Sequence, residues 1–99
     1  MTTSARPSAV GPTRLVFRMA DVLAANGAAY PMAGALSAAV RGRHQLDRSE
    51  YAHELGITLE QVDNAEAGRI PLRQLPEPIS SRIPWLGIDL TALAADPAA

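Results

Sequence analysis

The sequence contains no cysteine and no lysine among its 99 residues. Without cysteine, neither disulfide bonds nor thiolate chemistry is available to the chain. Only four residues are Phe, Trp or Tyr, and much of the 47% hydrophobic content is alanine, which buries little area. We therefore expect one small domain with a thin core, and modest stability unless an oligomer supports it.

Long apolar segments are also missing. No run approaches the roughly 20 residues that cross a bilayer, so no membrane segment is predicted. Arg6 near the N-terminus is not followed by the apolar stretch of a signal peptide. The expected location is therefore the cytoplasm, in association with the nucleoid if the chain binds DNA.

Charge is divided unevenly along the chain. Up to Arg43 five arginines oppose Asp21, a balance of +4, and from His44 onward four arginines oppose nine acids, a balance of −5. The two halves sum to the net charge of −1. A nucleic-acid-binding protein usually carries a basic face, and here such a face must be assembled from a few arginines.

Two helix-start signals stand close together in the middle of the chain. Asp47 followed by Glu50, and Thr58 followed by Gln61, are spaced as capping boxes, in which each side chain satisfies a backbone N–H at the start of a helix. Gly56 lies between them, where a chain leaving a helix often needs a positive φ. The pattern predicts two short helices joined by a tight turn.

The apolar residues of this stretch fit a helix-turn-helix, with Ala52 as the small residue where the helices meet and Gly68 as the stop. The inward positions are Tyr51, Leu55, Ile57, Val62 and Ala65. The whole pattern resembles the phage-repressor-like helix-turn-helix family (the Cro and repressor type, or XRE). An ordinary αα-hairpin is the alternative.

The resemblance covers roughly residues 31–94 and implies an all-α, small helix-turn-helix bundle of about five helices. A further helix at 13–27 would be an addition to that bundle. We expect residues 1–12 to form a disordered tail and residues 95–99 a second tail. There is no internal repeat and no second domain.

The extra helix at 13–27 has a broad apolar surface and a stop at Gly27. It either packs on its own domain and enlarges the thin core, or forms a contact with a partner or a second copy, since an exposed apolar stripe implies a contact. In the next helix, from Pro31 to Arg43, the expected inward face is mostly small. That helix is therefore either rotated or buried against 13–27.

Among family members, an arginine in the first helix pairs with a glutamate near the end of the recognition helix. The resemblance places these at Arg41 and Glu66 and implies a partly buried ion pair between them.

After Gly68 the chain is rich in proline. Prolines 76 and 78 fit the first turn of a helix, and Pro84 predicts a kink or an early helix end. Trp85 is expected in the core or at its edge, and Asp89 resembles the cap of the family's last helix, with Leu90 and Leu93 inward. The inward residues before that turn are Ile79, Ile83 and Leu86.

The resemblance implies that the helix from Thr58 to Ala67 enters the major groove of DNA. Near its start, Asn64 could bond adenine, Glu60 could accept from cytosine N4, and Leu59 could touch a thymine methyl group. Phosphate contacts would come from four further positions: Arg48, Thr58, Arg69 and Arg73.

The acids on this helix argue in the other direction. Glu60, Asp63 and Glu66 would bring carboxylates towards phosphates, against the attraction that supplies much of the affinity. The alternative is therefore a helix-turn-helix reused as a protein-interaction module, such as an adaptor, an antitoxin-like subunit or an anti-repressor.

Enzymatic chemistry is not predicted. His44 and His53 are isolated, and no zinc spacing, phosphate-binding glycine loop or nucleophile motif occurs. We expect no catalytic residue, no metal and no cofactor. The expected partner is double-stranded DNA, bound by a homodimer that could form through residues 13–27, and a protein partner is the alternative.

Overall fold

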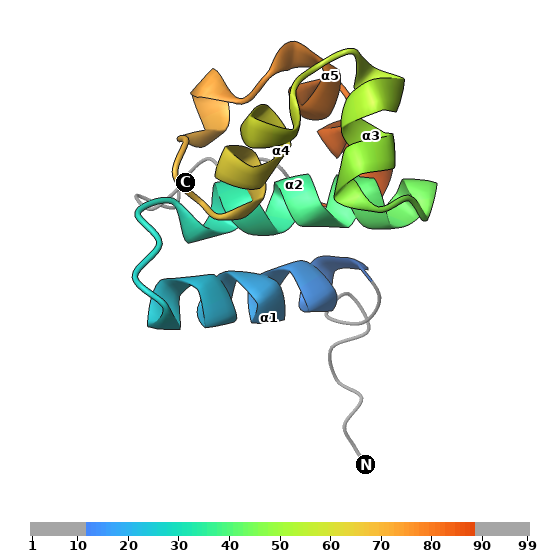
Figure 1. Ribbon diagram of the computed structural model, residues 1–99. Coiled ribbons are helices and arrows are strands. Elements are labelled where there is room, and N and C mark those ends of the chain that lie inside the picture. Colours follow the sequence, from blue (N-terminus) through green and yellow to red (C-terminus); the bar gives the residue numbers. More distant parts are fainter. Residues whose placement is uncertain (1–11, 89–99) are drawn as a thin grey trace.

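The computed structural model describes residues 12–88, and this part of the chain contains helices and no strand (Figure 1). The predicted all-α class is confirmed. The elements in chain order are α1 (Pro12–Ala25), α2 (Pro31–His44), α3 (Arg48–Leu55), α4 (Leu59–Glu66), the 3-10 helix η2 (Leu72–Gln74), α5 (Glu77–Ser80) and the 3-10 helix η3 (Ile83–Leu86).

The central element is α2, which has α1 on one side and the other helices on the opposite side (Figure 1). Half of its 14 residues are consequently buried, and four of those seven are Ala, Gly or Ser. Of the two explanations for its weak apolar face, rotation or burial against residues 13–27, the structure shows the second, because α1 packs on α2. The buried residues are Met32, Ala33, Gly34, Ala35, Leu36, Ser37 and Val40.

The extra N-terminal helix, α1, packs on its own domain. Val16 is fully buried and Ala20 is 6% exposed, both within the core. The helix begins at Pro12, a favourable first position, and Gly27 follows its end with a φ of +87°. Both flanks remain partly uncovered, because Leu15 and Val22 are 56% and 61% exposed on one and Phe17 is 44% exposed on the other. Packing within the domain therefore accounts for one face of α1 only.

The backbones of α2 and the segment after α4 approach each other closely at two glycines. The N–H of Tyr30 donates to the carbonyl of Gly68 at 2.9 Å. A Cβ on Gly34 would stand 2.8 Å from the backbone nitrogen of Gly68 and 2.8 Å from Cδ1 of Leu23. Gly68 itself has a φ of +74°, a backbone conformation that residues other than glycine rarely adopt. Hydrogen side chains at both positions thus allow α1, α2 and α4 to meet.

The proline-rich segment after Gly68 forms short helices, as its composition predicts. The three expected inward residues Ile79, Ile83 and Leu86 are all buried. Of the two positions expected for Trp85, the core or its edge, the core is wrong, since Trp85 is 58% exposed. Ile83 and Leu86 take the inward positions of η3, and the tight 3-10 turn leaves Trp85 pointing outward.

Some expectations fall outside residues 12–88. Residues 1–11 of the expected tail at 1–12 are among them, and so are the tail at 95–99 and the last helix, with its cap at Asp89 and with Leu90 and Leu93 inward. The tail bound itself is wrong at Pro12, which begins α1 because proline is well tolerated in a first helical turn.

Two glycines of α2 provide a matched test of this packing. Gly34→Ala should lower the free energy of unfolding by about 1–3 kcal/mol, because the added methyl group meets fixed backbone. Gly42→Ala should raise it by about 1 kcal/mol, because a Cβ there meets nothing within 4 Å and alanine favours the helix. Urea unfolding followed by circular dichroism measures both. Equal effects of the two changes would contradict the close approach at Gly34.

Candidate nucleic-acid interface

Both predicted capping boxes are present and fix the starts of α3 and α4. The Asp47 carboxylate accepts from the N–H of Glu50 at 2.8 Å, and the Glu50 side chain accepts from the N–H of Asp47 at 3.2 Å. Thr58 and Gln61 make the same reciprocal pair at 3.0 and 2.9 Å. Gly56 ends α3 with a φ of +72°. These contacts produce the expected helix, tight turn and helix.

The inner face of this unit packs through Tyr51, Val62 and Ala65, each fully buried, and Ala52, which is 4% exposed. The Tyr51 ring lies tilted against the imidazole of His44, with centroids 5.6 Å apart. Its hydroxyl has no hydrogen-bond partner within the described chain. Burial raises the pKa of Tyr51 to about 12, so this hydroxyl stays protonated at neutral pH and serves the core.

The ion pair between Arg41 and Glu66 joins α2 to the end of α4. Arg41 Nε donates to Glu66 Oε2 at 2.7 Å, and Nη2 donates to Oε1 at 3.1 Å. Arg41 Nη1 also donates to the carbonyl of Leu46 at 3.0 Å. The Glu66 side chain is only 2% exposed, and its hydrogen bond is the main cause of the raised pKa of Arg41. The pair is therefore bidentate and largely removed from water.

A second arginine joins the same carboxylate from α3. Arg48 Nε donates to Glu66 Oε1 at 3.2 Å, and Arg48 Nη1 donates to Asp63 Oδ1 at 3.3 Å. The Arg48 and Asp63 side chains are 53% and 43% exposed. Arg48 was expected at a phosphate, and in this DNA-free structure it lies on two carboxylates instead. The negative charge of Asp63, for which the sequence suggested no partner, is thus partly neutralised by Arg48.

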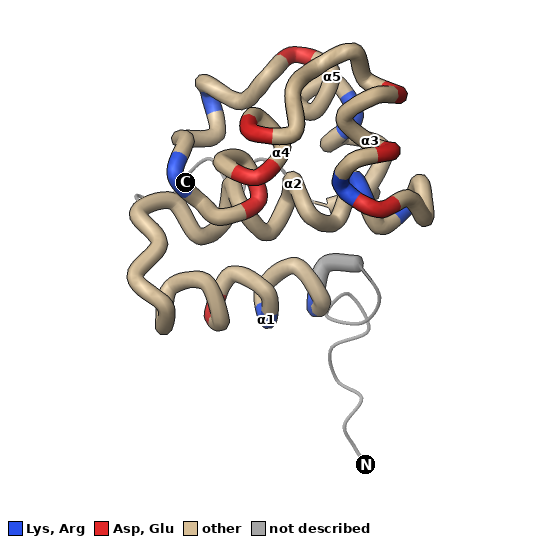
Figure 2. The backbone as a smooth tube through the Cα atoms, viewed as in Figure 1, with Lys and Arg blue, Asp and Glu red and all other residues tan. Residues whose placement is uncertain are grey.

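The outer surface of α4 carries the candidate base contacts. Leu59 is 43% exposed, and Glu60 and Thr58 are exposed as well. Asn64 is half-buried, and its side-chain oxygen accepts from Arg69 Nη1 at 2.9 Å. Acidic positions run along α4, with arginines at the start of α3 and in the loop that follows α4 (Figure 2). This oxygen can accept a second hydrogen bond, so the contact with Arg69 still leaves Asn64 able to accept from an adenine amino group.

The loop after α4 holds the remaining candidate phosphate contacts. Arg69 and Arg73 are both exposed, and Arg73 lies in η2. Neither forms a salt bridge with a carboxylate of residues 12–88. Their guanidinium groups are thus available to an anion beside α4.

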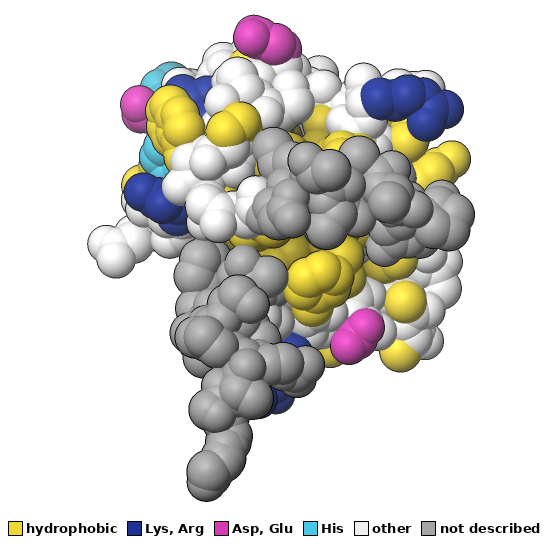
Figure 3. Space-filling view, turned by 180° about the vertical axis from the view of Figure 1, so that it is seen from behind, with side chains coloured by type: hydrophobic (Ala, Val, Ile, Leu, Met, Phe, Trp, Pro, Cys, Tyr) yellow, Lys and Arg dark blue, Asp and Glu magenta, His cyan; other side chains and the backbone are white. Residues whose placement is uncertain are grey.

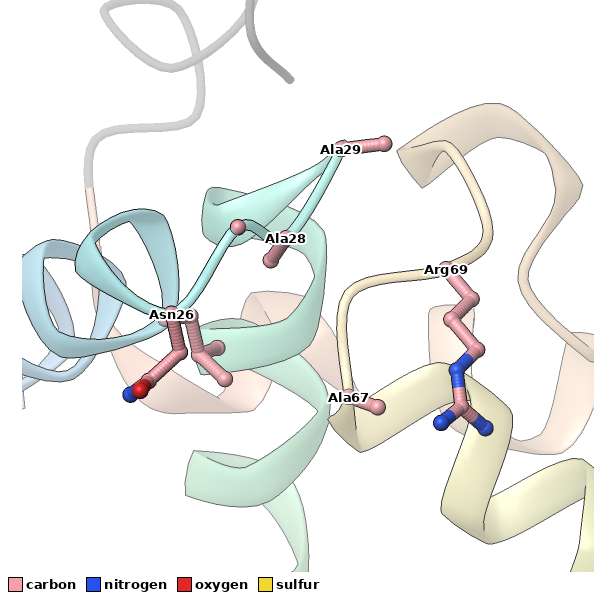
Figure 4. A pocket seen from close by; sticks show the side chains of 7 residues that line it. Asn26, Ala28, Ala29, Ala67 and Arg69 are labelled. Carbon is pink, nitrogen blue, oxygen red and sulfur yellow. The ribbon is translucent and has the colours of Figure 1, made fainter.

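A groove of about 470 Å³ opens between this loop and the turn that joins α1 to α2 (Figure 4). Ala67 and Arg69 form one wall, and Asn26, Ala28 and Ala29 lie on the other. Arg69 is the one charged residue among those lining the groove. Three of its seven lining residues are alanine and its single cation is already bonded to Asn64, so the groove offers little to bind a small molecule specifically.

Sequence reasoning identified the caps, the turn and the pair between Arg41 and Glu66, but it missed both contacts of Arg48. A pair within one helix follows from spacing of three or four residues. The contacts of Arg48 cross from α3 to α4, so they depend on the angle between two helices, which the local pattern does not give.

No cluster of three or more His, Asp or Glu side chains that could hold a metal ion occurs within residues 12–88. No helix in this range is long and apolar enough to cross a membrane. No family model matches the chain, and neither a curated protein nor a solved structure matches it.

The ion network makes a prediction about stability. Arg41→Ala should lower the free energy of unfolding by about 3–5 kcal/mol, because it leaves the Glu66 carboxylate buried with only the exposed Arg48 as partner. Arg48→Ala should cost less than about 1 kcal/mol, because that arginine is more than half exposed. Thermal and urea unfolding measure both variants.

A double variant, Arg41→Met with Glu66→Leu, should recover most of the loss, since it removes the buried charge as well as its partner. Equal destabilisation by Arg41→Ala and Arg48→Ala would contradict a larger contribution of the buried pair between Arg41 and Glu66 to stability.

Proposed function

We propose that the chain is a sequence-specific DNA-binding transcriptional regulator that places α4 in the major groove and acts in the cytoplasm, at the nucleoid. The single observation that carries the proposal is the uncovered outer surface of a doubly capped helix-turn-helix. Leu59 and Glu60, at the start of α4, are exposed while Val62 and Ala65 are fully buried. A helix presented in this way has the form that enters a major groove with its N-terminal residues against base edges.

Each candidate contact group of α4 has a chemically suitable partner on DNA. Asn64 can bond adenine, Glu60 can accept from the amino group of cytosine, and Leu59 can contact a thymine methyl group. The N-terminus of α4 at Thr58 offers backbone N–H groups to a phosphate. Arg69 supplies a charge on the side of α4 where the chain leaves the helix.

The local charge also permits this arrangement. Arg41 and Arg48 balance Asp63 and Glu66, so the ion network as a whole is neutral. On α4 and in the loop after it, what remains is Glu60 against two arginines, Arg69 and Arg73, a surplus of one positive charge. The exposed acids at the start and along α3 are outside this balance. The carboxylates of α4 therefore weaken the phosphate attraction much less than their number suggests.

The second candidate function is a protein-interaction module, and a specific observation favours it. Leu59 and Glu60 together present an apolar and an acidic group at the exposed start of α4. Such a pair suits a partner protein with a basic rim around an apolar pocket. A regulator should bind a particular DNA sequence, whereas an interaction module should have little affinity for DNA.

Selection from random-sequence duplex DNA separates them. A regulator should enrich a short motif, and its affinity for that motif should fall with rising salt, because binding releases counterions. Absence of any enriched sequence, together with a stable complex with another protein, would favour the interaction module.

Asn64→Ala tests the placement of the helix. It should relax base preference at one position, with a loss of about 1–3 kcal/mol for the preferred sequence. Arg69→Ala should instead weaken binding to all sequences alike and lower the salt slope by about 1. His53→Ala, an exposed change on α3, serves as the control. Unchanged base preference in Asn64→Ala would show that α4 is not the reading helix.

The proposal includes a dimer that forms through α1. Leu15, Met19 and Val22 recur at helical spacing, and the first and last of them are exposed. The stripe is short, so the dimer should be weak alone and gain strength from two half-sites on one DNA. In light scattering, Val22→Glu should lower the mass to that of a monomer, and Ala24→Glu, on the opposite flank, should not. A wild-type protein that is monomeric both alone and on DNA would exclude this dimer.

A further inference from the structure

An exposed tryptophan and two arginines meet at the end of α2, away from the outer surface of α4. Trp85 is 58% exposed. The guanidinium carbon of Arg82 lies 5.5 Å from the centroid of the Trp85 ring, and Arg43 Nη1 donates to the Trp85 carbonyl at 2.6 Å. We call these three residues the Trp85 platform. They come from α2, from η3 and from the turn before it, so the fold brings them together.

The two arginines of the platform differ from Arg41 and Arg48, which both lie on carboxylates. Within residues 12–88, neither Arg43 nor Arg82 forms a salt bridge with a carboxylate. Arg82 is held in place, because its Nη1 donates to the carbonyl of Pro78, while its Nε is buried without a partner. Arg43 is exposed. The platform therefore combines an exposed indole with two positive charges, neither of which forms a salt bridge with a carboxylate of residues 12–88.

The position of the platform separates it from the proposed DNA surface. In Figure 1, α4 faces the viewer, and the end of the described chain lies behind α3 and α4. The view from behind shows arginine, histidine and acidic side chains beside hydrophobic ones, at the edge that corresponds to α3 (Figure 3). A ligand on the platform would leave α4 uncovered.

The chemistry of the platform selects a particular kind of partner. Tryptophan and arginine are the residues on which binding energy most often concentrates in protein interfaces, and arginine binds carboxylates through paired N–H groups. A nucleic acid strand needs a basic groove that follows several successive phosphates. Here two arginines stand beside a single indole. Separate carboxylates next to an apolar residue fit this surface better than a continuous polyanion.

We propose that the Trp85 platform binds an acidic, apolar segment of another protein, with the apolar side chain on the indole of Trp85 and carboxylates on Arg43 and Arg82. The surface is small, so the complex is weak and transient, in the lower class of interface sizes. This inference does not depend on DNA binding by α4.

The test uses the full chain and a fluorescent synthetic peptide in which Asp alternates with Leu. Binding, measured by anisotropy, should weaken with rising salt, and Trp85→Ala should lower the affinity by about tenfold or more. Arg43→Glu should abolish it, whereas Arg18→Glu, an exposed charge reversal on α1, should change it little. A peptide of Lys and Leu should not bind.

Three outcomes would overturn the proposal. One is no binding of the acidic peptide, and another is binding that Trp85→Ala and Arg43→Glu both leave unchanged. The third is tighter binding of a single-stranded oligonucleotide that these variants abolish, which would make the platform a nucleic-acid site. Loss of helical circular dichroism in a variant is checked first, and Trp85→Phe then replaces Trp85→Ala as the milder change. With it, the acidic peptide should bind within a fewfold of wild type, and complete loss would contradict a stacking role for the ring.

Discussion

The buried carboxylate of Glu66 is the interaction on which the arrangement of the helices depends. A carboxylate that is 2% exposed must be compensated, and the compensation comes from two different helices, through Arg41 on α2 and Arg48 on α3. Because α4 ends at Glu66, both arginines act on the far end of that helix, and the capping box at Thr58 fixes its start. A helix held at both ends presents one defined outer surface, which is what any recognition by α4 requires.

The thin core imposes the second constraint. With so much alanine and so few aromatic residues, helices must approach closely to bury enough surface, and the small residues of α2 make this possible. The contact at Gly34 and Gly68 is the tightest example. The thin core also explains the presence of α1. Without α1, the face of α2 on which Val16 and Ala20 pack would be exposed to water. The added helix thus completes the core before any role in assembly is considered.

Local signals in the sequence predicted local structure well. Both capping boxes, the positive φ at Gly56 and the short helices around Pro84 follow from rules that involve neighbouring residues, and all are present. The Arg41 pair was also expected, through resemblance to a family. What could not be predicted depends on how helices pack. The contacts of Arg48 cross between two helices, and the outward position of Trp85 depends on the 3-10 geometry of η3.

Two groups of residues thus have different roles: the ion network orients α4, and the exposed residues would touch bases and phosphates. The most direct measurement is the change in backbone amide chemical shifts on adding an enriched duplex. The account predicts the largest changes at Thr58, Leu59, Glu60 and Asn64, with further changes at Arg48, Arg69 and Arg73 and little change at Trp85. Changes centred on the Trp85 platform, or none on α4, would contradict it.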